Sequence, residues 1–146
     1  MRVIPPVLVA GWATAQILVT RAAGGRHRFR GQTGSAIALG LASSLVGTAA
    51  VTQFVHHRTT FHPEHPDRTS ALVTDGVYAL SRNPMYVALA LALAAHAVWT
   101  GRARTLLAVP GFLLTLRPQV DAEEQALVRL FGDPYLDYTR RVPRWL

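Results

Sequence analysis

Arginines divide this chain into long stretches that contain no charged residue. Four such stretches, of 18, 27, 19 and 12 residues, are bracketed by the pairs Arg2 and Arg21, Arg30 and Arg58, Arg82 and Arg102, and Arg104 and Arg117. A helix that crosses a bilayer needs about 20 apolar residues. The first three stretches therefore predict membrane-spanning helices. The fourth would rise only about 18 Å as a helix, so it must continue past Arg117 or pair with the third stretch as a hairpin.

The composition supports a membrane protein and excludes several soluble classes. The chain is 50% hydrophobic and only 16% charged, against about 25% charged residues in a typical soluble domain. All 15 basic residues are arginine, and they border the uncharged stretches instead of forming the basic patch of a nucleic-acid-binding protein. The lack of cysteine excludes disulfides, thiolate zinc sites and a cysteine nucleophile. The lack of lysine indicates a GC-rich genome, so we expect a bacterial inner-membrane protein.

We predict an all-α integral membrane protein with about four transmembrane helices and a single domain, residues 1–146. Its expected parts are a first helix at 3–20, a second at 33–55, a cytosolic connecting segment at 56–83, a helical hairpin at 84–116, and cytosolic or interfacial helices at 117–146. The alternative for the first helix is a cleaved signal peptide, which Pro5-Pro6 and the short Met1-Arg2 start disfavour. The small residues of the second helix predict a place in the middle of the bundle. Pro110-Gly111 should bend the last helix of the hairpin.

The hairpin predicts that two polar segments meet. If residues 84–116 cross the membrane and return, then 56–83 and 117–146 emerge on the same side. A site can then form between them. We place both segments in the cytosol, with both termini, although the arginines near residues 21–30 oppose the positive-inside tendency.

Asn83-Pro84 has the features of a helix start. Asparagine is a favoured N-cap, proline suits the first helical position, and the residue before proline is pushed out of the α region. Arg82 then lies just outside the helix and Tyr86 on its first turn. A helix N-terminus beside an arginine can bind an anion. The alternative is that Asn83-Pro84 only caps the helix and Arg82 only reaches the membrane surface.

A paired glutamate lies in the polar C-terminal part. Val120, Glu124, Leu127 and Phe131 are at helical spacing, which places Glu124 on the apolar stripe, with Glu123 at its flank, before a helix stop at Gly132. A buried carboxylate needs a partner. The alternative is a solvated pair that forms helix salt bridges, for instance with Arg129.

Asp133-Pro134 predicts a further helix start, and Tyr135, Tyr138 and Val142 share one face of the helix that follows. This helix is expected at the membrane interface. The alternative to a functional role is that it only anchors the protein there. His56, His57, His62 and His65 cluster in the sequence, but Pro63 and Pro66 stiffen this segment and no carboxylate-rich helix accompanies it, so we expect no metal site. His96, inside a predicted span, is either functional or a neutral hydrogen-bonding partner of another helix.

Taken in order, these pieces resemble the isoprenylcysteine carboxyl methyltransferase family and the wider membrane methyltransferases that include phospholipid methyltransferases. The resemblance is carried by the stretches 72–78 and 81–86, the pair Glu123-Glu124, Phe131-Gly132, Tyr135, Tyr138, and the stretch 142–145. Among these, the Arg-Asn-Pro-Met-Tyr motif followed by a hairpin and a paired Glu carries the most weight.

The resemblance implies an S-adenosylmethionine-dependent methyltransferase with a cofactor pocket that faces the cytosol. The cofactor-pocket residues that it implies are Tyr78, Arg82, Asn83, Tyr86, Glu123 and Glu124. Arg82 would hold the cofactor's carboxylate, and a glutamate its ribose hydroxyls or ammonium group. The catalytic residues that we expect are Arg141 and Glu124. Arg140 or Arg141 would orient an anionic group of the acceptor, and we prefer Arg141 because it directly precedes Val142-Pro143. We expect a lipophilic acceptor that enters from the bilayer, contacts with membrane lipids, and no nucleic acid or required protein partner.

Two other functions remain open from the sequence. Sterol reductases share a similar nucleotide-binding C-terminal part, so a membrane reductase that uses NADPH to reduce a lipophilic alkene is the alternative enzyme. A small membrane scaffold whose arginines bind anionic lipid is the non-catalytic alternative.

Overall fold

The computed structural model describes residues 5–22, 28–56 and 71–146, and within them all regular structure is helical. The elements are α1 (Pro5–Ala22), α2 (Gln32–His56), the 3-10 helix η2 (Gly76–Ala79), α3 (Pro84–Thr100), the 3-10 helix η3 (Ala103–Leu107), α4 (Ala108–Phe131) and α5 (Asp133–Arg141). The predicted all-α class is confirmed. The predicted start at Asn83-Pro84 is also confirmed, and the start predicted at Asp133-Pro134 lies one residue earlier, since Gly132 is the N-cap and Asp133 the first helical residue.

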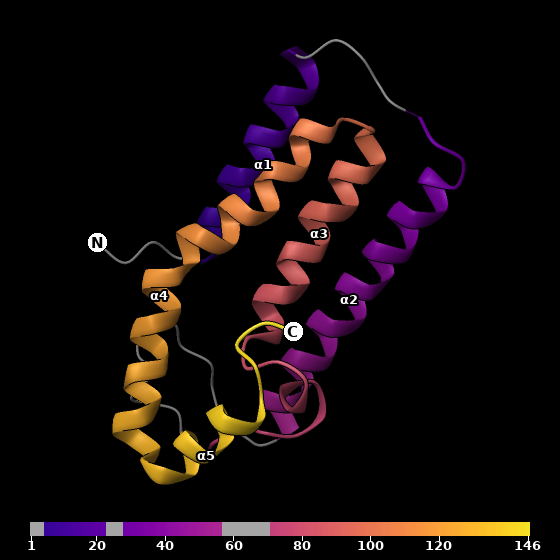
Figure 1. The fold of residues 1–146 in the computed structure, drawn as a ribbon. Helices are drawn as coiled ribbons and strands as arrows, with labels where there is room; N and C mark the ends of the chain where they lie inside the picture. Colours follow the sequence, from indigo (N-terminus) through magenta and orange to yellow (C-terminus); the bar gives the residue numbers. More distant parts are fainter. Residues whose placement is uncertain (1–4, 23–27, 57–70) are drawn as a thin grey trace.

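Helix α3 occupies the middle of the bundle and contacts α1, α2 and α4 (Figure 1). Helix α2 lies at the edge and packs against α3 and η2, so its predicted central position is wrong. Its small residues do allow one close contact: Ser43 donates a hydrogen bond to the Ala88 carbonyl at 2.7 Å, and Gly47 lies against the Ala88 side chain. Gly40, on another part of the helix, has open space around it. Small residues therefore bring α2 close to α3 through Ser43 and Gly47, and Ala50 packs against Val73 and Tyr78.

Helix α4 continues well past Arg117, which was one of the two outcomes that the short fourth stretch allowed. Because α4 begins at Ala108, Pro110 lies in its first turn, where a backbone N–H needs no helical acceptor. Pro118 lies inside the helix instead, and α4 changes direction along its length (Figure 1). Gly111 has a different role: a side chain there would overlap the ring of Trp12, so this glycine lets α1 approach α4.

The two polar segments come together at one end of the bundle. The C-terminal end of α2, η2, the start of α3 and helix α5 all lie at this end (Figure 1). Among the described residues, one stretch, Gln32–Gln53, is long and apolar enough to cross a membrane by itself, and Pro84–Thr100 is a shorter apolar helix. Within the described residues, the structure thus confirms the helices and the meeting of 71–83 with the C-terminal part, but not four membrane spans.

Candidate functional site

The C-terminal tail is bound to the start of α3 by three consecutive residues. The Arg82 backbone N–H donates to the Pro143 carbonyl at 3.0 Å. The Ser81 hydroxyl and the Asn83 side-chain amide both donate to the Arg144 carbonyl, at 3.3 and 3.1 Å. Asn83 thus precedes the helix as predicted, but its side chain holds the tail instead of capping the helix.

Arg82 is the centre of this arrangement. Its Nε and Nη2 donate to Glu124 Oε1 at 3.1 and 2.9 Å, and its Nη1 donates to the carbonyls of Thr139 and Val142, each at 3.1 Å. Guanidinium has five N–H donors, and these bonds use four of them. The side chains of Arg82 and Glu124 are 13% and 16% exposed. Arg82 therefore connects α3, α4 and the tail in a largely desolvated position.

A second arginine completes the cluster. Arg144 donates to Glu124 Oε2, and its Nη1 is 2.7 Å from an Asp121 carboxylate oxygen. The bond with Glu124 is the main cause that raises the pKa of Arg144. Glu124 thus lies between two arginines, and its predicted need for a partner is confirmed, although neither partner is Arg129. The sequence did not predict the roles of Arg144 and Asp121. The stretch 142–145 drew attention to Arg144, but nothing in the sequence indicated its pairing with Asp121.

Glu123 points to a different neighbour. The Tyr86 hydroxyl donates to its two carboxylate oxygens, at 2.9 and 3.2 Å, and the Gln119 side chain donates to one of them at 3.0 Å. Glu123 is the buried member of the pair, since the buried face of α4 is formed by Ala108, Phe112, Leu116, Val120 and Glu123. The predicted stripe through Glu124 is therefore wrong by one residue. Three-residue spacing after Val120 takes Glu123 inward and turns Glu124 toward the tail.

Three tyrosines attach α5 to the segment before α3. Tyr135, Tyr138 and Val142 share a buried face, as predicted, but that face packs on protein side chains that include Leu72. The Tyr138 hydroxyl donates to the Tyr78 carbonyl at 2.6 Å. Burial raises the pKa of Tyr138 to about 12. Desolvation also raises the pKa of Tyr78 and of Tyr135 above the ordinary range. All three phenols therefore stay protonated at neutral pH.

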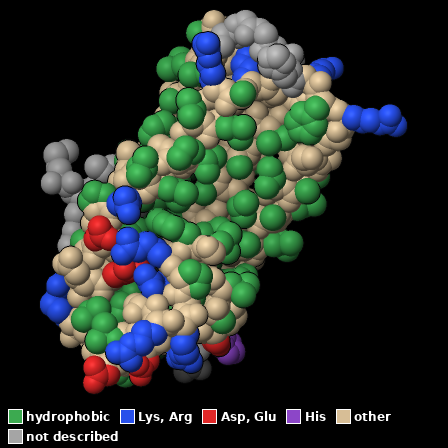
Figure 2. All heavy atoms as spheres, in the orientation of Figure 1, with side chains coloured by type: hydrophobic (Ala, Val, Ile, Leu, Met, Phe, Trp, Pro, Cys, Tyr) green, Lys and Arg blue, Asp and Glu red, His purple; other side chains and the backbone are tan. Residues whose placement is uncertain are grey.

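A cavity of about 660 Å³ opens beside the arginine cluster. It is lined by Arg82, Asp121, Glu124, Gln125, Val128, Arg129, Tyr135, Leu136, Thr139 and Arg144. Figure 2 shows carboxylates and arginines gathered around this end of the molecule, while hydrophobic side chains are spread over the middle of the visible face and further basic side chains lie at the opposite end. The lining of the cavity therefore combines positively and negatively charged side chains with an aromatic ring and apolar side chains.

The predicted site residues occupy distinct places. Arg82 and Glu124 line the cavity, whereas Tyr86 and Glu123 pair in the interior of the bundle. Arg141 is exposed and bonds only weakly, at 3.4 Å, to the Asp137 carbonyl. It does not line this cavity.

The histidines divide in a similar way. His96 Nδ1 is 3.0 Å from Gln16 Oε1, so it forms the cross-helix hydrogen bond that was one of its two predicted roles. His56 is exposed at the end of α2. His57, His62 and His65 lie outside the described residues.

Known proteins are similar to much of this chain, including the stretch that contains Arg82 and Glu124. The family described as phospholipid methyltransferase matches residues 33–134. The protein-S-isoprenylcysteine O-methyltransferases of Mus musculus and Homo sapiens are 36% and 35% identical over 86 residues, which is 53% of this chain and 28% of each relative. An uncharacterized protein of Haemophilus influenzae is 40% identical over 63 residues, 42% of this chain and 100% of the relative. No solved structure matches the chain significantly.

The family match covers the start of α3, the paired glutamates and all of α4, and the predicted resemblance is confirmed. The chain spans less than a third of the length of the mammalian relatives. On the extent of the family match, this chain belongs to the phospholipid methyltransferase family.

Proposed function

We propose that this protein is an S-adenosylmethionine-dependent methyltransferase whose cofactor occupies the cavity beside Arg82 and Glu124. The observation that carries the proposal is the cluster of Arg82, Glu124 and Arg144, which joins three segments distant in sequence around an open cavity. Breaking such a partly buried cluster is costly. The cluster also borders an open cavity, so its charged groups face a space that a ligand can enter. Family membership supplies the reaction class.

The donors and acceptors of the cavity fit this cofactor. S-adenosylmethionine carries a carboxylate, an ammonium, a sulfonium, a ribose diol and an adenine ring. Arg129 has no hydrogen-bond or ion-pair partner among the described residues, and its charge is therefore available for the carboxylate. Arg82 adds its one remaining N–H. Asp121 and Glu124 can accept from the ammonium and the ribose, and Tyr135, Val128 and Leu136 provide an apolar surface for the ring.

When bound, the cofactor supplies an electrophilic methyl group on a positively charged sulfur. The protein then has to hold the acceptor in line at about 3–3.5 Å and exclude water. The tail fixed by Arg82 forms one wall of the cavity through Thr139 and Arg144, and the bound cofactor and acceptor would displace water from the rest. Arg141, at the exposed face of α5, is placed to attract an anionic group of the acceptor from the membrane surface.

The acceptor in this proposal is a lipophilic molecule that enters from the bilayer. Four membrane helices with the cavity at the cytosolic surface give both substrates access, since S-adenosylmethionine is made in the cytosol. In this proposal the membrane is a bacterial inner membrane. The assignment is supported by the absence of lysine among the basic residues and by the Haemophilus influenzae relative. Neither a nucleic acid nor a protein partner is required.

Calorimetry on the full chain in detergent tests the proposal. S-adenosylhomocysteine and NADPH are titrated separately into the purified protein. We expect S-adenosylhomocysteine to bind and NADPH not to bind. Binding of NADPH alone would indicate the reductase, and binding of neither would favour the scaffold.

A matched pair of arginine variants of α4 tests the position of the cofactor. Arg129→Gln should weaken binding of S-adenosylhomocysteine about tenfold, because a hydrogen bond to a charged group contributes roughly 1.5 kcal/mol or more. Arg117→Gln removes the same charge from an exposed position of the same helix that does not line the cavity. It should leave the affinity unchanged. Equal affinities in both variants would place the cofactor elsewhere.

A further inference from the structure

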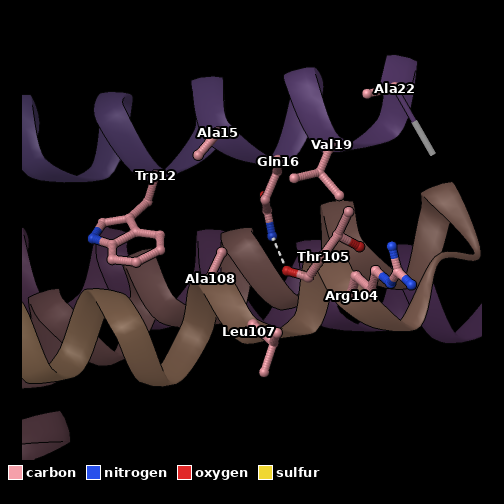
Figure 3. A pocket seen from close by; sticks show the side chains of 9 residues that line it. All are labelled: Trp12, Ala15, Gln16, Val19, Ala22, Arg104, Thr105, Leu107 and Ala108. Carbon is pink, nitrogen blue, oxygen red and sulfur yellow. Dashed lines mark hydrogen bonds between the residues drawn. The ribbon is translucent and has the colours of Figure 1, made fainter.

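A second cavity, of about 510 Å³, lies at the other end of the bundle, between α1 and the segment where η3 joins α4. Its apolar lining consists of Trp12, Ala15, Val19, Ala22, Leu107 and Ala108. Figure 3 shows these side chains along a groove that follows α1, with Arg104 near the Ala22 end. The volume is within the range of about 300–1,000 Å³ that is typical of small-molecule sites.

The polar groups of the groove are already bonded within the protein. Gln16 Nε2 donates to the carbonyls of Leu93 and Thr105, at 3.0 and 2.9 Å, and its Oε1 contacts His96. The Thr105 hydroxyl donates to the Arg102 carbonyl, and Trp12 Nε1 donates to the Thr115 hydroxyl. The groove therefore presents mainly hydrocarbon, and a polar solute would find no free partner along it. An apolar chain fits this lining.

Arg104 is the exception, because its exposed guanidinium has no hydrogen-bond or ion-pair partner within the described residues. Carboxylates are also distant from it in sequence, since Asp and Glu are absent between residues 76 and 120. Arg21, Arg28, Arg30 and Arg102 belong to the same end of the bundle. This end, called here the arginine end, therefore carries an excess of positive charge, which attracts anions.

We propose that the groove binds one acyl chain of an anionic phospholipid, with the headgroup phosphate paired to Arg104. The ligand combines the two chemistries that the groove offers, an apolar channel and a single cation at its end. Phosphate pairs well with guanidinium, and arginines near a membrane surface are attracted to anionic lipid. This site is separate from the cofactor cavity, since the two share no lining residue.

Native mass spectrometry of the full chain in detergent tests this site. The protein is mixed with phosphatidylglycerol or with phosphatidylcholine of identical acyl chains. We expect one phosphatidylglycerol molecule to be retained in preference to phosphatidylcholine. Equal retention of both lipids would overturn the pairing with Arg104. Because the readout is lipid retention, it is independent of whether S-adenosylhomocysteine binds at the other end.

Three variants separate a defined site from general electrostatic attraction. Arg104→Gln should reduce retention of phosphatidylglycerol about fivefold, as expected for one arginine near a lipid phosphate. Arg30→Gln removes an exposed arginine of the arginine end that does not line the groove, and should have little effect. Ala15→Leu fills the groove and should abolish retention. Equal losses in Arg104→Gln and Arg30→Gln, or full retention in folded Ala15→Leu, would refute the site.

Discussion

The two ends of this bundle carry arginines that do opposite things. At the site end, formed by η2, the start of α3, the second half of α4 and α5, Arg82 and Arg144 are paired with Glu124 and join distant segments. At the arginine end, Arg104 faces solvent without a carboxylate, and the polar contacts of the interior are neutral, centred on Gln16. Paired charges therefore hold together the end where we place the chemistry. Neutral hydrogen bonds hold together the end where we propose that a phospholipid binds.

The largest effect should come from Glu124→Ala. This change leaves Arg82 and Arg144 without their shared carboxylate in a position that is mostly desolvated. Loss of one partner from such a pair typically costs about 2–5 kcal/mol, so we expect S-adenosylhomocysteine affinity to fall about 30-fold or more. Calorimetry on the folded variant measures the loss.

The matched control is Asp137→Ala, which removes the partner of Arg140 in an exposed pair whose side chains are 74% and 61% exposed. Exposed pairs contribute little, so its affinity should equal that of the wild type. If Glu124→Ala and Asp137→Ala bind S-adenosylhomocysteine equally well, the buried ion pair contributes no more to cofactor affinity than the exposed one, and the prediction is wrong.

Alkaline pH should weaken the site end before it affects the rest of the bundle. Burial raises the pKa of Tyr138 from 10.0 to about 12 in the folded state. The contribution of this phenol to stability is therefore complete below pH 10, and it is lost as the pH rises toward 12. Phenolate absorbance and the fluorescence of Trp145 in the tail should change together over this range. In Tyr138→Phe the fluorescence change should move to higher pH; an identical profile would mean that another group controls it.

At the other end, Gln16→Leu should affect stability without affecting the cofactor. The change removes a buried side chain that bonds to Leu93, Thr105 and His96. Hydrogen bonds between helices in a membrane contribute about 0.6–2 kcal/mol, so the thermal transition should fall by a few degrees. S-adenosylhomocysteine affinity should stay at the wild-type value. A large loss of affinity would show that the two ends are energetically coupled.

The smallest effect on binding is expected for Arg141→Ala. Arg141 is exposed and lies outside the cofactor cavity, so affinity for S-adenosylhomocysteine should stay within about twofold. Turnover with a lipophilic acceptor should decrease, because we assign this residue to the acceptor. A loss of cofactor affinity in this variant alone would reverse the two roles.

Local rules predicted the helix boundaries of the site correctly. Asn83-Pro84, Gly132 and Asp133 act through their own backbone preferences, so neighbouring residues suffice to place a helix start or stop. The meeting of the two polar segments followed from the hairpin. This inference required only the lengths of the two helices and the turn between them, because the segments that flank a hairpin emerge on the same side.

Tertiary partners decided the rest. Periodicity placed Glu124 on the apolar stripe, but the partner of Glu123 is Tyr86 on another helix, and that contact determines which carboxylate faces inward. The acceptors of Arg82 in the tail are backbone carbonyls, which leave no mark in a sequence. The role of Gln16 could have been recognised from the sequence. It is a strongly polar side chain in an uncharged stretch, where such residues usually face other helices.

The attachment of the tail to α3 also sets an order of events during synthesis. Residues 139–144, which bind Arg82 and Asn83, leave the ribosome after α1 to α4. Until then Arg82 lacks two of its carbonyl acceptors, and one wall of the cofactor cavity is missing. On our proposed function, the bundle of α1 to α4 cannot bind the cofactor at this stage. It becomes competent only after residues 139–144 have left the ribosome and packed against Arg82 and Asn83.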